Sequence, residues 1–348
     1  MGSELELDEA RARFVGLYDR LKDELLQDPV FDLMDEARRY VEEMLDYNIR
    51  GGKLNRGFSV IETYKLLKDG QDMSEEEFFL AGVLGWSLEW LQACLLVLDD
   101  IMDNSTTRRG QLCWYKLPKV GSRAINDGVF IKGSIHKMVK RYFRDKPYYV
   151  DLLELSDEIA LQTSFGQMLD LVYSHESERD LSKYNMPAYR RIVQYKTSYY
   201  SFYLPIACAL LLHGEKPENF TDVKNVLVEM GILFQAQDDF LDCFGDPEVT
   251  GKIGTDIEDH KCSWLIVQAL ERGNDDQLKV LYDNYGKGDP DCITQVKNVY
   301  KELDLENAFF EYELSSFAEL LSSIEDLPNP AVQEVLKSFL RKIYGRKK

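Results

Sequence analysis

Two aspartate-rich segments carry the residues best suited to chemistry in this chain. They are Asp99-Asp100-Ile101-Met102-Asp103 and Asp238-Asp239-Phe240-Leu241-Asp242. In each segment the first and last aspartates are four residues apart, so they lie on one face of a helix, one turn from each other. Carboxylates this close repel each other unless a cation lies between them. Oxygen ligands of this kind suit Mg²⁺, which keeps several waters and bridges to substrate phosphates.

Each aspartate-rich segment follows a run of apolar residues at helical spacing. The first run includes Leu84, Leu88 and Leu91, and the second extends from Val226 to Leu233. One such motif could be the solvated end of a surface helix, but two motifs that each end a buried helix favour a metal site. The candidate metal ligands are Asp99, Asp100, Asp103, Asp170, Asp238 and Asp242.

Basic residues lie close to both aspartate-rich segments. The formal net charge is −19, so the chain as a whole repels anions and general affinity for nucleic acid is not expected. Local Arg and Lys can reverse that field, because Arg fits phosphate oxygens bidentately and Lys supplies a point charge. Each residue alone could be a surface cation, and the glycine pair Gly51-Gly52 could let backbone N–H groups approach phosphate. The candidates for a diphosphate site are Lys53, Arg56, Arg108, Arg109, Lys196, Lys252, Lys261 and the C-terminal Arg346-Lys347-Lys348.

The cysteines and the N-terminus bear on the compartment. The six cysteines show no metal-type pairing and are typical of reduced thiols. The start of the chain is acidic, unlike a secretory signal or a transit peptide, and we find no apolar run long enough to span a membrane. We therefore expect a cytoplasmic protein.

Hydrophobic spacing is helical along most of the chain. Phe14, Leu17, Tyr18, Leu21 and Leu25 form one stripe, and similar stripes recur to the C-terminus, whereas strand-like alternation is scarce. No linker or short repeat divides the sequence. We expect an all-α fold in which residues 1–348 form a single domain, a large bundle of about ten helices around a deep central cavity.

These motifs together resemble those of the trans-prenyl diphosphate synthases, and most closely the farnesyl diphosphate synthases of plants. The resemblance covers essentially the whole chain. It is carried by Gly51-Gly52-Lys53-Leu54-Asn55-Arg56-Gly57, by the run from Leu98 to Gln111, by Lys196-Thr197, by Gln235 to Asp242, by Gly251 to Asp256, and by Lys342-Ile343-Tyr344.

The resemblance implies a helical homodimer that joins an allylic diphosphate to isopentenyl diphosphate. It also implies about three Mg²⁺ ions per active site, which stabilise the negative charge of the departing diphosphate. Asp99, Asp103 and Asp170 would bind Mg²⁺ that holds the allylic diphosphate, and Asp238 would bind another ion.

The resemblance also assigns residues to the two substrates. Isopentenyl diphosphate would be held by Lys53, Arg56, Gln92 and Arg109. The allylic diphosphate would be contacted by Arg108, Lys196 and Lys252. The developing allylic cation would face Lys196, Thr197 and Gln235, and the basic C-terminal tail would close over the site.

The sequence departs from this family at the residues expected to limit product length. Cys94 and Leu95 lie about one helical turn before Asp99, where the farnesyl synthases usually carry two aromatic residues. Smaller side chains could give a deeper pocket and a longer product, or a neighbour such as Met168 or Leu169 could fill the space. We expect farnesyl diphosphate as the main product, with a geranylgeranyl or mixed-product synthase as the alternative.

Three other functions are compatible with part of the pattern. A terpene cyclase also uses an aspartate-rich helix, but it typically has an Asn/Ser/Glu motif in place of Asp238 to Asp242. An irregular prenyl coupling enzyme is expected to alter the second motif, and a regulatory subunit is expected to lose one motif. Both motifs are intact here, which favours the chain-elongating synthase.

Overall fold

The structure, a computed structural model, describes residues 2–174, 180–216, 219–250 and 254–345. Two compact units divide the chain: one consists of Met1–Ser156 and Leu204–Asn219, and the other of Asp157–Tyr203 and Phe220–Lys348. Almost all regular structure in both units is helical, so the expected all-α class is confirmed. The single domain and the deep central cavity stay predictions.

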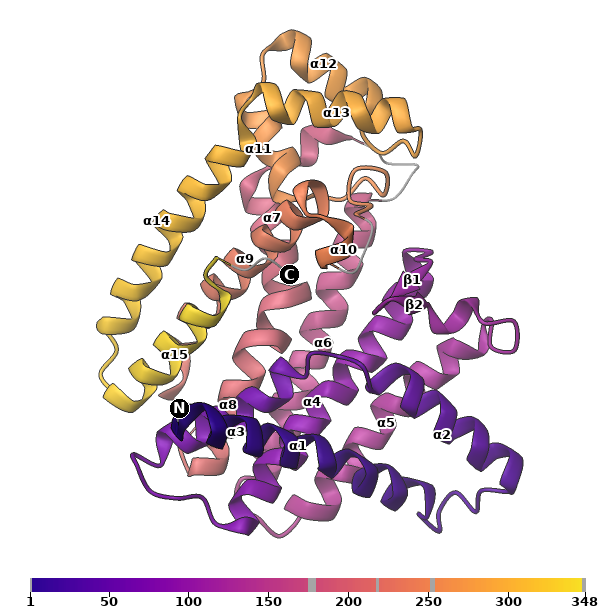
Figure 1. Cartoon of the computed structure of the whole chain (residues 1–348), viewed down its shortest axis with the longest axis vertical. Coiled ribbons are helices and arrows are strands. Elements are labelled where there is room, and N and C mark those ends of the chain that lie inside the picture. The colour runs from indigo at the N-terminus through magenta and orange to yellow at the C-terminus, as the bar shows by residue number, and fades with distance from the viewer. Residues whose placement is uncertain (1, 175–179, 217–218, 251–253, 346–348) are drawn as a thin grey trace. The chain divides into compact units, whose positions relative to one another are not determined.

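The first unit is organised around one long apolar helix, α4 (Glu75–Met102). Helices α3 and α5 pack along it, and α1, α2 and α8 also contact it (Figure 1). The other elements are α1 (Gly2–Leu26), α2 (Asp35–Ile49), α3 (Asn55–Leu67), β1 (Thr107–Arg108), β2 (Gln111–Leu112), η1 (Trp114–Lys116), α5 (Arg123–Phe143) and α8 (Leu204–His213).

The second unit is organised around α9 (Thr221–Phe244), which packs against η4, α7, α11, α14 and α15 (Figure 1). Helix α6 (Tyr149–Ser174) begins in the first unit and continues into the second. The other elements are η3 (Leu181–Lys183), α7 (Met186–Val193), the π-helix η4 (Gln194–Tyr203), α10 (Pro247–Thr250), α11 (Trp264–Arg272), α12 (Asp275–Asn284), α13 (Pro290–Glu302), α14 (Leu305–Glu325) and α15 (Pro330–Ile343).

Helix α4 corrects the expectation about membrane-spanning length. It is long and apolar enough to cross a membrane by length and composition, so the statement that no run is long enough is wrong. However, 83% of its most apolar window is buried inside the structure. That burial is what the central helix of a folded unit shows, since such a helix is apolar on every side.

Glycines allow helices to cross very closely at three places. A Cβ on Gly85 of α4 would lie 2.4 Å from the carbonyl oxygen of Gly57 of α3. A Cβ on Gly166 of α6 would lie 2.1 Å from the backbone nitrogen of Lys196, and one on Gly231 of α9 would lie 2.3 Å from Ser198 Oγ. Any side chain at these glycines would force the paired helices apart.

A capping box fixes the start of α4. The Ser74 hydroxyl accepts a hydrogen bond from the Glu77 backbone N–H at 3.2 Å, and the Glu77 carboxylate accepts one from the Ser74 N–H at 2.7 Å. Glu77 also accepts hydrogen bonds from Tyr64 Oη and Lys68 Nζ, each at 2.9 Å. The backbone N–H of Ser74, followed by Lys68 and Tyr64, lowers the pKa of Glu77 to about 2.

Replacing Glu77 with Gln should therefore destabilise the chain in a pH-dependent way. The amide can still complete the capping box but loses the charge paired with Lys68, so we expect the free energy of unfolding to fall by about 1 kcal/mol near pH 7. The depressed pKa means that this contribution is present above the unfolded value of 4.5 and is lost as the pH falls toward the folded value. Urea unfolding at about pH 7 and at about pH 3 should show that the free-energy difference between the parent and Glu77→Gln is smaller at the acidic pH.

Glu75→Gln is the matched control, because the Glu75 side chain is 87% exposed. Its free energy of unfolding should stay within about 0.5 kcal/mol of the parent at both pH values. An effect of Glu77→Gln that is equally large in acid would contradict the assignment.

Candidate active site

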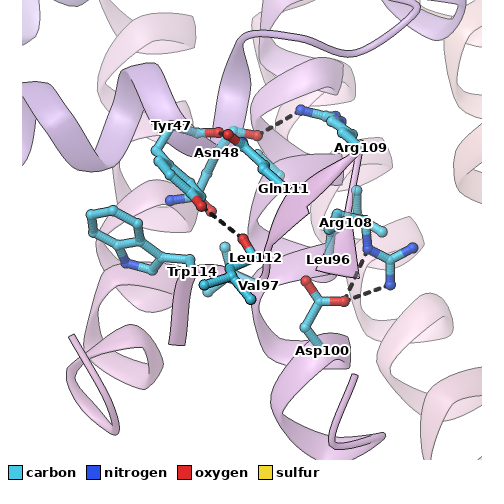
Figure 2. Close-up of a pocket in the computed structure, with 11 residues that line it drawn as sticks. Tyr47, Asn48, Leu96, Val97, Asp100, Arg108, Arg109, Gln111, Leu112 and Trp114 are labelled. Atoms are coloured by element: carbon cyan, nitrogen blue, oxygen red, sulfur yellow. Dashed lines mark hydrogen bonds and ion pairs between the residues drawn. The ribbon is translucent and has the colours of Figure 1, made fainter. Parts of the chain in front are cut away.

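The first aspartate-rich motif forms the last turn of α4, and its three carboxylates have different surroundings. Asp100 is 4% exposed, and its Oδ1 accepts hydrogen bonds from Arg108 Nε at 2.9 Å and Nη2 at 2.6 Å (Figure 2). Asp99 and Asp103 are half-buried, and Arg108 Nη2 lies 3.5 Å from Asp99 Oδ2. Asp100 therefore orients Arg108, while Asp99 and Asp103 are the better candidates for metal ligands.

A short β-hairpin, absent from the sequence predictions, presents the two arginines. Strands β1 and β2 pair antiparallel, with Arg108 opposite Gln111. Arg109 and Gly110 form the connecting turn with φ of 54° and 75°, the positive values that the favoured two-residue turns require. The Arg109-Gly110 pair was the signal available in the sequence.

Arg109 points to the end of α2 and explains one of the glycines. Its Nη1 donates hydrogen bonds to the carbonyl oxygens of Asn48 and Arg50, each at 2.9 Å. A Cβ on Gly52 would lie 2.8 Å from Arg109 Nη2. Gly52 thus leaves room for a guanidinium, in addition to the phosphate role expected from the sequence.

The residues assigned to isopentenyl diphosphate lie around the start of α3. Lys53 is exposed and Arg56 is half-buried, and Arg56 Nη1 donates to Gln92 Oε1 at 3.1 Å. Arg11 of α1, which the sequence analysis missed, donates to the carbonyl oxygen of Lys53. Nothing in the local pattern could have identified Arg11, because its partner is 42 residues away.

A pocket in the first unit is lined mainly by residues of α2, α4 and the hairpin. Asp100, Arg108 and Arg109 contribute its charged lining, and Tyr47, Leu112 and Trp114 are among its other walls (Figure 2). Tyr47 Oη donates to the Leu112 carbonyl oxygen at 2.8 Å, which ties α2 to the hairpin. Two cations and one carboxylate at a small pocket suit an anion better than a neutral ligand.

Asp170 of the second unit lies between two lysines. Its Oδ2 accepts hydrogen bonds from Lys196 Nζ at 2.6 Å and from Lys261 Nζ at 2.8 Å. Burial alone would raise the pKa of Asp170, but the charges of the two lysines outweigh it and hold that pKa well below its usual range. The close crossing at Gly166 brings Lys196 to Asp170, which lies one turn after Gly166 on α6.

The second aspartate-rich motif forms the C-terminal part of α9. Asp239 is 4% exposed, and it accepts hydrogen bonds from the Trp264 backbone N–H at 2.7 Å and from Gln235 Nε2 at 2.9 Å. Burial raises the pKa of Asp239 to about 7. Thr197 Oγ1 donates to Gln235 Oε1 at 2.9 Å, so two of the three residues assigned to the allylic cation form a hydrogen-bonded chain with Asp239, while Lys196 donates to Asp170.

The two outer carboxylates of this second motif are half-buried and one turn apart on α9. They are Asp238 and Asp242, and Asp242 Oδ2 accepts a hydrogen bond from the Asp256 backbone N–H at 3.0 Å. Both motifs therefore place the middle aspartate inside the fold and leave the outer pair half-buried near a helix end. Lys252 and Arg346-Lys347-Lys348 lie outside the described residues.

The donor set fits Mg²⁺ held jointly by protein and substrate. Among the residues that the structure describes, no group of three or more His, Cys, Asp or Glu side chains is arranged to hold a metal ion by itself. Mg²⁺ is usually bound through one or two carboxylates together with substrate phosphates. The outer aspartates of each motif supply one or two carboxylates of this kind.

The two residues expected to limit product length differ in their surroundings. Cys94 is 4% exposed, and its burial raises the pKa of the thiol to about 11. Leu95 is half-buried, so a larger side chain there meets less of the packed core than one at Cys94.

An almost wholly helical fold with two DDxxD motifs, each near the C-terminal end of a long helix, is the combination expected of prenyl diphosphate synthases. The Polyprenyl synthetase family matches residues 38–303 of this chain, and the chain belongs to that family.

Its relatives agree over almost the full length. The chain is 60% identical over 346 residues to "Farnesyl pyrophosphate synthase 1, mitochondrial" of Arabidopsis thaliana, covering 99% of this chain and 90% of that protein. It is 62% identical over 338 residues to "Farnesyl pyrophosphate synthase 1" of Cannabis sativa, covering 97% and 99%. Among solved structures, a T. brucei farnesyl diphosphate synthase complexed with risedronate matches with a TM-score of 0.92 and 35% identity, covering 97% of this chain and 100% of that chain.

Removing the carboxylate between the two lysines should destabilise the second unit. In Asp170→Ala, Lys196 and Lys261 would lose their shared partner and repel each other, so we expect the free energy of unfolding to fall by about 3 kcal/mol. Lys261→Met is the matched control, because Asp170 keeps its ion pair with Lys196. In denaturant unfolding, the free energy of unfolding of Lys261→Met should be well above that of Asp170→Ala. Equal free energies for the two variants would contradict this interpretation.

Proposed function

We propose that this chain is a magnesium-dependent prenyl transferase that condenses dimethylallyl diphosphate and then geranyl diphosphate with isopentenyl diphosphate to give farnesyl diphosphate. The observation that carries the proposal is the presence of both aspartate motifs, with the outer pair half-buried in each, in a chain that is 60% identical to a relative named farnesyl pyrophosphate synthase. A terpene cyclase or a regulatory subunit would not need an intact second motif.

Mg²⁺ fits the outer aspartates of both motifs. In the first unit the ligands are Asp99 and Asp103, and in the second they are Asp170, Asp238 and Asp242. The bound ion supplies neutralisation of the diphosphate charge as the leaving group departs. Asp170 retains its negative charge despite burial because two lysines surround it, so it can serve as a ligand without first losing a proton.

The basic residues of the first unit bind and orient the anionic substrates. Arg108, which Asp100 orients, contacts the allylic diphosphate. Lys53, Arg56, Gln92 and Arg109 bind isopentenyl diphosphate, and the hydrogen bond between Arg56 and Gln92 sets the direction of that guanidinium before the substrate arrives. Such preorganised donors cost little reorganisation when charge develops.

The polar chain of the second unit faces the allylic cation. Thr197 and Gln235 present oxygen atoms, and Gln235 in turn donates to Asp239. Lone pairs directed at the developing positive charge stabilise it without forming a bond, which leaves the carbon open to attack by the alkene of isopentenyl diphosphate.

Chromatography of the products tests this proposal. The purified chain with Mg²⁺, dimethylallyl diphosphate and isopentenyl diphosphate should yield farnesyl diphosphate. Asp238→Ala should lower kcat by about 10² to 10³, the usual cost of losing one preorganised electrostatic contact. Asp222→Ala is the control, because Asp222 is an exposed residue in the first turn of the same helix, α9, and this variant should retain parental turnover. Near-normal turnover by a folded Asp238→Ala variant would reject the role of the second motif.

A homodimer is also part of the proposal. Helix α6 carries an exposed apolar stripe in the second unit, formed by Leu161 (68% exposed), Phe165 (39%), Met168 (50%) and Val172 (53%). The spacing of four, three and four residues places them on one face of the helix. A contiguous exposed apolar face of this kind marks a protein interface, and a second copy of this chain is the partner that the family resemblance implies.

Charge on that stripe should abolish the dimer. We expect the parent to show twice the mass of one chain by light scattering after size exclusion, and Leu161→Glu with Phe165→Glu to show the mass of a single chain. Val30→Glu is the control, since Val30 is 74% exposed and lies in a turn of the first unit, outside helix α6. A dimeric double variant would place the interface elsewhere.

Product length is expected to depend on Leu95 more than on Cys94. A Phe at the buried Cys94 would overpack the core at a cost of about 1 to 3 kcal/mol, whereas a Phe at the half-buried Leu95 can project toward the substrate. We expect Leu95→Phe to shift products from farnesyl toward geranyl diphosphate, measured by chromatography. Any geranylgeranyl diphosphate from the parent should disappear in the same variant. An unchanged product profile would assign the limit to another residue.

The compartment stays a prediction. We propose the cytoplasm as the compartment, while one relative at 60% identity is named as mitochondrial. Fluorescence imaging of a C-terminal fusion of the full chain would distinguish the two.

A further inference from the structure

Glu89 is a buried acid that the proposed mechanism does not use. It lies on α4 and is 2% exposed. Its Oε1 accepts a hydrogen bond from the Gly57 backbone N–H at 2.7 Å. A buried carboxylate in an apolar helix is costly unless it is paired, so its placement next to an anion-binding segment calls for a physical reason.

The start of α3 lacks a cap of its own. Its N-cap residue, Leu54, adopts a left-handed conformation with φ of 53° and provides no side-chain hydrogen bond. Gly57 is the third residue of the helix, and its N–H is one of the donors that a helix leaves without an internal partner. The Glu89 carboxylate therefore caps α3 from the neighbouring helix, with favourable charge at the positive end of the helix dipole.

The glycine crossing fixes how Glu89 reaches Gly57. A Cβ on Gly57 would lie 2.6 Å from the Gly85 carbonyl oxygen and 2.8 Å from Glu89 Cγ. Glu89 lies one turn after Gly85, and Gln92 follows near the next turn. Arg56 is thus held at both ends: Glu89 binds the amide of the following residue, and Gln92 binds the guanidinium.

The surroundings of Glu89 indicate that it holds the backbone of α3 in place and is not present for its negative charge. Burial raises the pKa of Glu89, while the Gly57 N–H and the guanidiniums of Arg56, Arg109 and Arg11 oppose that rise. A negative charge beneath a cluster of cations weakens the attraction of that cluster for diphosphate. If Glu89 acted through its charge alone, it would weaken diphosphate binding by the neighbouring arginines. If it fixes the backbone of α3, it helps to place those arginines for binding.

The other two glycine crossings place functional side chains in the same way. One turn after Gly166, Asp170 reaches across to Lys196, and one turn after Gly231, Gln235 reaches across to Thr197. Glu89 repeats this arrangement at the third crossing, toward the segment that carries Lys53 and Arg56.

We propose that Glu89 is a positioning residue that holds the first turn of α3 and so sets Arg56 in place for isopentenyl diphosphate. This inference rests on the proposed assignment of Lys53, Arg56 and Gln92 to that substrate. It predicts that the length of the acid, not its charge, decides binding.

Three variants at position 89 test the proposal in the full chain with Mg²⁺. Glu89→Asp keeps the charge but is one methylene too short to reach Gly57, so we expect KM for isopentenyl diphosphate to rise about tenfold, the loss of one hydrogen bond. Glu89→Ala should show the same rise. Glu89→Gln keeps the accepting oxygen at the same reach, and its KM should stay within about threefold of the parent. KM for the allylic substrate should change by less than about twofold in all three.

Arg56→Ala in the same assay separates the two ways in which the inference could fail. If Arg56→Ala raises KM for isopentenyl diphosphate selectively but Glu89→Asp does not, the role of Glu89 is overturned and the substrate assignment stands. If Arg56→Ala is not selective, the substrate assignment fails and the inference fails with it. If Glu89→Ala folds poorly, the comparison of Glu89→Asp with Glu89→Gln decides the question. If Glu89→Asp raises KM equally for isopentenyl diphosphate and for the allylic substrate, Glu89 only stabilises the fold and the proposal is overturned.

Discussion

Four half-buried carboxylates, Asp99, Asp103, Asp238 and Asp242, stand at the ends of two helices in a chain whose net charge is −19. Diphosphates carry the same sign of charge, so these groups can bind such substrates only through cations. The rest of the arrangement follows from that constraint. The middle aspartates turn inward, where Asp100 orients Arg108 and Asp239 accepts from Gln235 and Trp264, and the outer ones are the ligands that we propose for the metal.

Close helix crossings are the device that places the remaining polar side chains. At Gly85, Gly166 and Gly231 the absence of a Cβ lets two helices approach until backbone atoms meet. A side chain one turn further along then reaches the neighbouring helix at hydrogen-bonding distance. Rigid helices therefore hold the groups that we propose to bind or orient substrate, and helices position side chains more exactly than loops do. The π-helix η4 contributes Lys196 and Thr197, and π-helical turns occur frequently at functional sites.

The sequence predicted the helical class and both acidic motifs because these depend on local spacing. Phe14, Tyr18 and Leu21, expected on one stripe, are each at most 3% exposed. Residues whose partners are distant in sequence were beyond such reasoning. Arg11 meets Lys53 across 42 positions, and Glu89 meets Gly57 across 32, so only the packing of helices could identify them. The sequence also could not predict that the middle aspartate of each motif is buried and the outer two are half-buried, because residue spacing alone does not distinguish their surroundings.

The central proposal is that tight binding of an allylic diphosphate by this acidic chain requires Mg²⁺ in addition to the basic side chains. Calorimetric titration of geranyl diphosphate into the full chain, without isopentenyl diphosphate, tests it most directly. We predict that replacing Mg²⁺ with excess EDTA raises the dissociation constant at least about 100-fold, which is a loss of roughly 2.7 kcal/mol in binding free energy. Equal affinity with and without the ion would contradict it.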